Sequence, residues 1–113
     1  MALMYVEIGD IGYTFKKDTD RELILLDARF CVSNVNTSLL EIPETVVLSD
    51  GIEYKVTKVA SRSLDRINLF KEIRFPNSII EIPVYCFYEC NKVEKLIFGY
   101  GITTQPNSFT HDA

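Results

Sequence analysis

The large apolar residues between Phe75 and Phe98 are unevenly spaced in the stretch FPNSIIEIPVYCFYECNKVEKLIF. Neither the two-residue period of a half-buried strand nor the 3.6-residue period of an amphipathic helix explains this spacing. A shift of the chain against itself that places Val56 on Ile79 explains it, because apolar residues then fall on apolar residues. The further pairs are Val59 with Ile82, Leu64 with Phe87, Ile67 with Cys90, Phe70 with Val93, Ile73 with Leu96, and Phe75 with Phe98.

The second half of the chain is therefore predicted to consist of structural repeats. A third copy begins at Ile102 and stops after Phe109, with Gln105 where an apolar residue is expected. A period of about 20 to 29 residues with one short strand per unit is typical of leucine-rich repeats. Such a unit is too small to bury its own apolar side, so it must stack on its neighbours.

Each unit is predicted to form one coil of a solenoid. The segments FKEIRF (70–75) and VEKLIF (93–98) end in an alternating apolar pair, which predicts a short strand. Pro76 ends the first of these strands because proline cannot donate a ladder hydrogen bond. The segments SRSLDRI (61–67) and VYCFYEC (84–90) predict a helical or 3₁₀ turn that points one large residue inward.

The first half of the chain predicts two hairpins. GYTFKK (12–17) and RELILLDA (21–28) are joined by a short polar turn, and Asp50–Gly51 lies between two apolar-rich runs. Residues 1–36 are predicted to form an N-terminal β cap, since an uncovered solenoid end exposes apolar surface and open strand edges. Four residues before the second hairpin align with the repeat: Leu40, Ile42, Pro43 and Val46, with Ile73, Phe75, Pro76 and Ile79.

The repeat resembles the BspA-like leucine-rich repeat, with a consensus close to I-P-x-S-V-x-x-I-x-x-x-A-F-x-x-C-x-x-L-x-x-I-x-I. The resemblance covers residues 38–109 and includes the Pro-x-Ser motif, the Phe and the Cys at the family's own offsets. Leu64 and Ile67 replace that Phe and Cys in the first copy, and both stay apolar. The matching residues are Pro76, Ser78, Ile79, Ile82, Phe87, Cys90, Val93, Leu96 and Phe98.

The expected fold is α/β and β-rich: a short leucine-rich-repeat solenoid with an N-terminal β-hairpin cap. Residues 1–36 form the cap, and residues 37–113 form about two and a half repeats with a period of 23. The two parts are expected to make one compact domain, as the length of 113 residues suggests.

Composition narrows the possible functions. The net charge is −4, and no basic cluster exceeds Lys16–Lys17, so a nucleic-acid-binding surface is not expected. No apolar run approaches the roughly 18 residues that a membrane-spanning helix needs. The chain also begins without the basic region of a secretory signal, which leaves its compartment open.

Catalytic chemistry is not expected. Cys31, Cys86 and Cys90 are predicted to be reduced core residues, and His111 lies close to the end of the sequence. A Cys–His pair needs an orienting partner, and the spacing of Cys86 and Cys90 does not suggest zinc. We therefore expect no enzyme activity, no metal and no cofactor.

Two candidate surfaces remain. The outward positions of the short strands would bear opposite charges one repeat apart, which predicts a charge ladder rather than catalytic carboxylates. The predicted pairs are Lys71 with Glu94, Glu72 with Lys95, and Glu41 with Arg74. The candidate interaction face consists of Lys71, Glu72, Arg74, Glu94, Lys95, Ile97 and Tyr100. The candidate self-association face consists of Leu96, Phe98, Ile102 and Phe109.

The main hypothesis is a non-catalytic protein-binding module with an unidentified protein partner. The resemblance implies cell-surface or secreted proteins of bacteria and protist parasites, linked to adhesion and host-protein binding. The alternative is a structural protein that forms a homodimer through an open C-terminal repeat face, or a fragment of a longer array.

Overall fold

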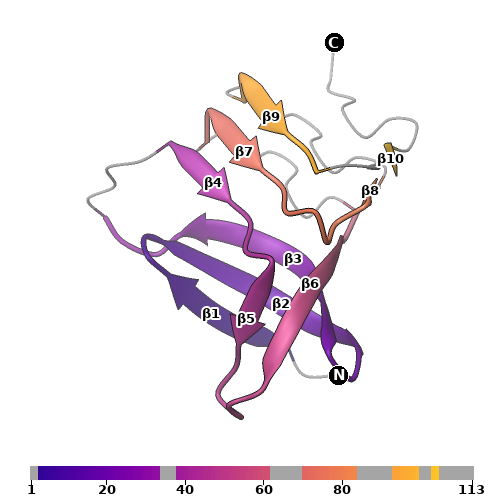
Figure 1. Cartoon of the computed structure of the whole chain (residues 1–113). Helices are drawn as coiled ribbons and strands as arrows, with labels where there is room; N and C mark the ends of the chain where they lie inside the picture. Colours follow the sequence, from indigo (N-terminus) through magenta and orange to yellow (C-terminus); the bar gives the residue numbers. More distant parts are fainter. Residues whose placement is uncertain (1–2, 34–37, 62–69, 84–92, 100–102, 105–113) are drawn as a thin grey trace.

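The computed structural model describes residues 3–33, 38–61, 70–83, 93–99 and 103–104. These residues form strands and connecting turns, and no helix lies among them (Figure 1). The prediction of a β-rich fold is therefore confirmed. The two predicted helical or 3₁₀ turns fall almost entirely in 62–69 and 84–92, outside the described residues.

The largest of the three described sheets has five strands in the order β1-β2-β3-β6-β5. Its strands are β1 (Met4–Ile8), β2 (Ile11–Thr19), β3 (Glu22–Phe30), β6 (Glu53–Val59) and β5 (Thr45–Val47). The pairing is antiparallel except between β3 and β6, which run in parallel. The β2–β3 pair is the hairpin that the sequence predicts.

Strand β3 contains a β-bulge that changes its alternation. Thr14 pairs with Asp27 and Phe15 pairs with Leu25, so one extra residue is inserted in β3 between these pairs. An extra residue reverses the side on which the following side chains lie. Leu25 and Ala28 are consequently both buried, although strict alternation would place them on opposite sides of the sheet.

The predicted hairpin at Asp50–Gly51 is confirmed and joins β5 to β6. Gly51 has a φ of +78°, a left-handed conformation that glycine adopts without steric cost. Its N–H donates to the carbonyl of Leu48 at 2.9 Å. The Asp50 carboxylate accepts the Ile52 N–H at 2.9 Å and the Tyr54 hydroxyl at 2.7 Å, which fixes the turn against β6.

A three-stranded parallel sheet contains the repeated strands. It consists of β4 (Leu39–Glu41), β7 (Glu72–Arg74) and β9 (Lys95–Ile97), in that order. Leu40 pairs with Ile73, and Ile73 pairs with Leu96, as the sequence alignment of the repeats predicts. Leu40 and Ile73 are fully buried, and Leu96 is half-buried.

A second parallel pair supports the same periodicity. Strand β8 (Glu81–Ile82) pairs with β10 (Thr103–Thr104), which follows it by nearly one repeat along the chain. Between β7 and the end of β8 the chain buries Phe75, Ile79 and Ile82. The Ser78 hydroxyl donates to the Val56 carbonyl at 2.6 Å, which ties this segment to the repeat before it.

The two larger sheets share one hydrophobic core. Its buried members include Phe15 and Leu25 of the five-stranded sheet together with Leu40 and Ile73 of the parallel sheet. The rings of Phe30 and Phe70 lie 4.9 Å apart between centroids. The Tyr13 hydroxyl donates to the carbonyl of Glu41 at 3.0 Å. The N-terminal hairpin therefore packs directly against the repeated strands.

The central position of Ile73 predicts a large effect on stability. We expect Ile73→Ala to reduce the free energy of unfolding by about 2–5 kcal/mol, because it leaves a cavity between two stacked strands. Ile97→Ala is the matched control, because Ile97 is exposed and follows Leu96 on β9. Its free energy of unfolding should stay within about 0.5 kcal/mol of the wild type. Urea unfolding of both variants checks this, and equal losses would contradict the stacking.

The Asp50 turn predicts a dependence of stability on pH. The Ile52 N–H and the Tyr54 hydroxyl lower the pKa of Asp50 below its ordinary value of 3.8, with Lys17 adding a smaller effect. A lowered pKa in the folded state stabilises the fold above pH 3.8, and this stabilisation is lost as the pH falls further.

We therefore expect the wild type to be more stable than Asp50→Asn. The difference in the free energy of unfolding should be constant at neutral pH and shrink in acid. Thermal unfolding between pH 7 and pH 2 measures it. Tyr54→Phe should show part of the same change, because it removes one of the two hydrogen bonds. A difference that grows as the pH falls would contradict this assignment.

Candidate interaction surface

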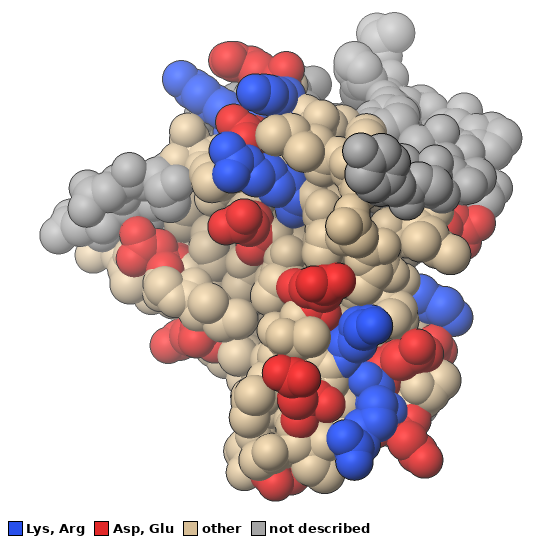
Figure 2. Space-filling view, viewed as in Figure 1, with Lys and Arg blue, Asp and Glu red and all other residues tan. Residues whose placement is uncertain are grey.

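The outward positions of the parallel sheet form a continuous exposed surface. Side chains alternate along each three-residue strand, so the middle residue points inward and its two neighbours point outward. One outward row is Leu39, Glu72 and Lys95, and the other is Glu41, Arg74 and Ile97. Figure 2 shows charged side chains of both signs gathered over the end of the molecule that carries these strands.

Opposite charges are neighbours on this surface, as the sequence predicts. Glu41 lies beside Arg74 and Glu72 lies beside Lys95 in the strand register. The Glu94 N–H donates to the Lys71 carbonyl at 2.7 Å, so this predicted pair is also adjacent.

Among the described residues of this surface, however, the direct ion pair lies within one strand. Arg74 Nε contacts Glu72 Oε2 at 2.6 Å, and both residues belong to β7. A hydrogen bond and the negative charge of Glu72 raise the pKa of Arg74, and Glu41 adds to this effect. The sequence alignment of repeats could find neighbours on adjacent strands, but it could not find this pairing between two residues of the same strand.

Ile97 gives the surface an apolar element. Its side chain is 37% exposed and lies next to Arg74 in the register. Tyr100, the other aromatic candidate for this face, lies outside the described residues. The described outward surface thus combines charges of both signs with one exposed apolar side chain.

The candidate self-association face is described only in part. Leu96 and Phe98 are half-buried and pack against the core, and the Phe98 ring lies 5.4 Å from that of Phe75. Ile102 and Phe109 lie outside the described residues. The described part of this face is therefore an apolar surface at the last strand of the sheet, covered on one side by the preceding repeat.

The reactive residues are mostly outside the described part of the chain. Cys86, Cys90 and His111 all lie there. Cys31 is a free thiol, but the prediction that it is a core residue is wrong: it follows the last residue of β3 and is only half-buried, outside the hydrophobic core. Its Sγ lies 3.7 Å from the Gly9 carbonyl, and partial burial raises its pKa, with Glu7 adding a smaller effect. Among the described residues no three His, Cys, Asp or Glu side chains are grouped to hold a metal ion. The expectation of a non-catalytic protein stays a prediction.

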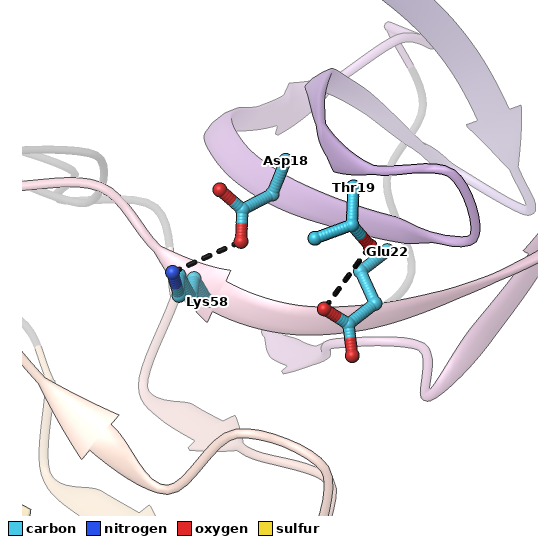
Figure 3. A network of polar contacts seen from close by, with 4 residues as sticks. All are labelled: Asp18, Thr19, Glu22 and Lys58. Atoms are coloured by element: carbon cyan, nitrogen blue, oxygen red, sulfur yellow. Dashed lines mark hydrogen bonds and ion pairs between the residues drawn. The ribbon is translucent and has the colours of Figure 1, made fainter.

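A polar network beside β6 was not predicted from the sequence. Lys58 of β6 contacts Asp18 of β2 at 2.9 Å, and the Thr19 hydroxyl donates to Glu22 at 3.2 Å (Figure 3). The Asp18 carboxylate raises the pKa of Lys58. These side chains line a hollow of about 660 Å³ that also contacts the 60% exposed Ile80. No spacing signal links them, because the contact depends on the parallel pairing of β3 with β6.

Comparisons with known proteins give structural matches only. No protein-family model and no curated protein matches the chain. A leucine-rich repeat protein from Bacteroides capillosus superimposes with a TM-score of 0.67 and 26% identity, over 84% of this chain and 65% of that one. The chain has a leucine-rich repeat fold. The predicted resemblance to leucine-rich repeat proteins is thus confirmed.

Two further structures agree with this fold. A leucine-rich repeat protein from Bacteroides ovatus has a TM-score of 0.68 and 22% identity, over 86% of this chain and 24% of that one. A leucine-rich cell surface protein from Faecalibacterium prausnitzii has a TM-score of 0.63 and 20% identity, over 95% of this chain and 25% of that one. This leucine-rich repeat chain therefore spans about two thirds of the first relative and about a quarter of the other two.

The described residues contain no helix that is long and apolar enough to cross a membrane.

Proposed function

We propose that this chain is a non-catalytic protein-binding module of the BspA-like leucine-rich-repeat type. In this proposal residues 1–36 are a β-hairpin cap and residues 37–113 are a short solenoid. The shared core of the N-terminal hairpin and the repeats supports this arrangement. The parallel pairs β7–β9 and β8–β10 support it too, because each joins strands from successive repeats.

The observation that carries the proposal is the outward surface of β4, β7 and β9. Parallel strands place equivalent residues side by side, so each repeat extends the same surface. Charges of opposite sign are balanced there, and Ile97 is an exposed apolar residue among them. Such a surface fits a protein partner with both polar and apolar groups better than a strongly charged polymer.

Surface adhesion or binding of a host protein is the specific role that we propose. The relative from Faecalibacterium prausnitzii is named a cell surface protein, and its fold is shared by this chain. Adhesion uses the same property that the surface offers, namely an extended area rather than a deep pocket.

We expect Ile97→Asp to reduce binding to a protein partner at least tenfold, because it places a charge at the apolar position of the surface. The measurement is biolayer interferometry against a panel of immobilised extracellular-matrix and bacterial surface proteins. Ile80→Asp is the matched control, since Ile80 is a 60% exposed isoleucine outside the parallel sheet. A partner lost in both variants, or in neither, would show that binding does not use this surface.

Self-association through the last strand is the second candidate. Strand β9 is at the end of the parallel sheet in the described residues, and Leu96 and Phe98 are only half-buried. A second copy could pair with this edge and cover both side chains.

We expect light scattering behind size exclusion to show a dimer that Leu96→Glu abolishes. The concentration range should span a hundredfold, and circular dichroism should show that the variant stays folded. A wild type that remains monomeric throughout the range would rule out this second candidate.

A further inference from the structure

A groove separates the two end strands of the five-stranded sheet. The sheet curls so that its two end strands, β1 and β5, approach each other (Figure 1). Residues of both strands line a hollow of about 750 Å³. Residues from Leu3 to Glu7 line one side, and residues from Val47 to Asp50 line the other. Lys17 of β2 also contributes to the lining. This groove is distinct from the surface of β4, β7 and β9.

The backbone of β1 presents hydrogen-bonding groups to the groove. A two-residue turn with Gly9 at φ +61° makes Ile8 and Ile11 a hydrogen-bonded pair, and such pairs alternate along an antiparallel ladder. Val6 and Met4 are then the other residues of β1 that bond to β2. The N–H and C=O groups of Tyr5 and Glu7 therefore point away from β2, toward the groove.

On the opposite side, Val47 of β5 lines the groove and its backbone groups are also unpaired with β6. The Val56 N–H donates to the Glu44 carbonyl at 2.8 Å, and the Leu48 N–H donates to the Ile52 carbonyl at 3.2 Å. By the same alternation, Thr45 and Val47 direct their N–H and C=O groups away from β6. Within the described residues no strand pairs with the outer edge of β1 or β5.

The side chains of the groove are apolar on both faces of the sheet. Met4, Val6 and Leu48 face the core and are only partly buried against it. Leu3, Tyr5 and Val47 are on the outside, with exposed fractions of 62%, 61% and 61%. A strand placed between β1 and β5 would bury side chains of both sets.

The charge at the groove indicates what such a strand must carry. Lys17 lies 5.1 Å from the centre of the Tyr54 ring, and Tyr54 donates its hydroxyl to Asp50, so this cation already has partners. Glu7 lies at the rim, where its carboxylate accepts only the Tyr5 hydroxyl among the described contacts, at 3.0 Å. The lining thus has two carboxylates against one ammonium group, and a net negative charge.

We propose that the groove binds an extended segment of a partner polypeptide in which apolar residues alternate with Lys or Arg. The segment adds as a β-strand, with backbone hydrogen bonds to both edges, apolar side chains toward Met4, Val6 and Leu48, and a basic side chain beside Glu7. The five residues of β1 correspond to about 17 Å of extended chain, so the bound segment needs about the same number of residues to pair along the whole strand. A second copy of this chain fits less well, because its net charge is −4 and its own edge carries the same Glu7.

The probe is the capped heptapeptide Val-Lys-Val-Lys-Val-Lys-Val, titrated into the isotope-labelled full chain and followed by NMR. We expect chemical-shift changes and slower amide hydrogen exchange at Tyr5, Glu7, Thr45 and Val47. The strands of the parallel sheet should not respond. Absence of binding at millimolar peptide, or shifts confined to the parallel sheet, would overturn the proposal.

Two variants, Glu7→Lys and Val47→Pro, separate recognition of the charge of the peptide from recognition of its backbone. Glu7→Lys should weaken the lysine peptide about fivefold and strengthen the peptide with Glu in place of Lys by a similar factor. Glu94→Lys makes the same charge change on the other sheet, and it should leave both affinities unchanged.

Val47→Pro removes an N–H that faces the groove and spares the bonds of β5 to β6, so the sheet should remain intact. We expect it to weaken both peptides. Affinities that are unaffected by both Glu7→Lys and Val47→Pro would overturn the proposal. Protection of Tyr5 and Glu7 that rises with protein concentration, without peptide, would instead identify a second copy as the occupant.

Discussion

The parallel stacking of Leu40, Ile73 and Leu96 is the constraint on which the rest of the structure depends. Each strand of this sheet has three residues, too few to be stable without neighbouring strands. The register brings one inward side chain of every strand into the same row. Phe75 and Ile79 can then turn into the core behind that row, and the N-terminal hairpin can pack against it through Phe30 and Phe70.

Much of this arrangement could be predicted from the sequence, because it rests on the spacing of apolar residues. The shift by one repeat paired Ile73 with Leu96, and the Asp50–Gly51 dipeptide marked a turn. The bulge in β3 could not be predicted, since Leu25, Leu26 and Ala28 are all compatible with either face. The parallel pairing of β3 with β6 was also missed, because no local signal specifies a partner strand so distant in the sequence.

The candidate surfaces could be predicted to different degrees, because only one of them follows the spacing of the repeats. Residues on the repeated strands follow the period, so the neighbours Glu41 and Arg74 could be found before the structure was known. The groove between β1 and β5 depends on how strongly the five-stranded sheet curls, a property of the whole sheet. Tyr5 and Val47 are far apart in the sequence and have no shared pattern that would place them together.

The alternation along β4, β7 and β9 assigns core packing and the proposed recognition to different residues of the same strand. The middle residue of each strand carries the packing, whereas its two neighbours carry the exposed charges and Ile97. Mutations at the outer positions can accumulate over evolutionary time with little loss of stability, since those side chains contribute little to the core. In the proposed binding role, a lineage could therefore exchange one ligand for another by drift in the outer rows, with the row of Leu40, Ile73 and Leu96 unchanged.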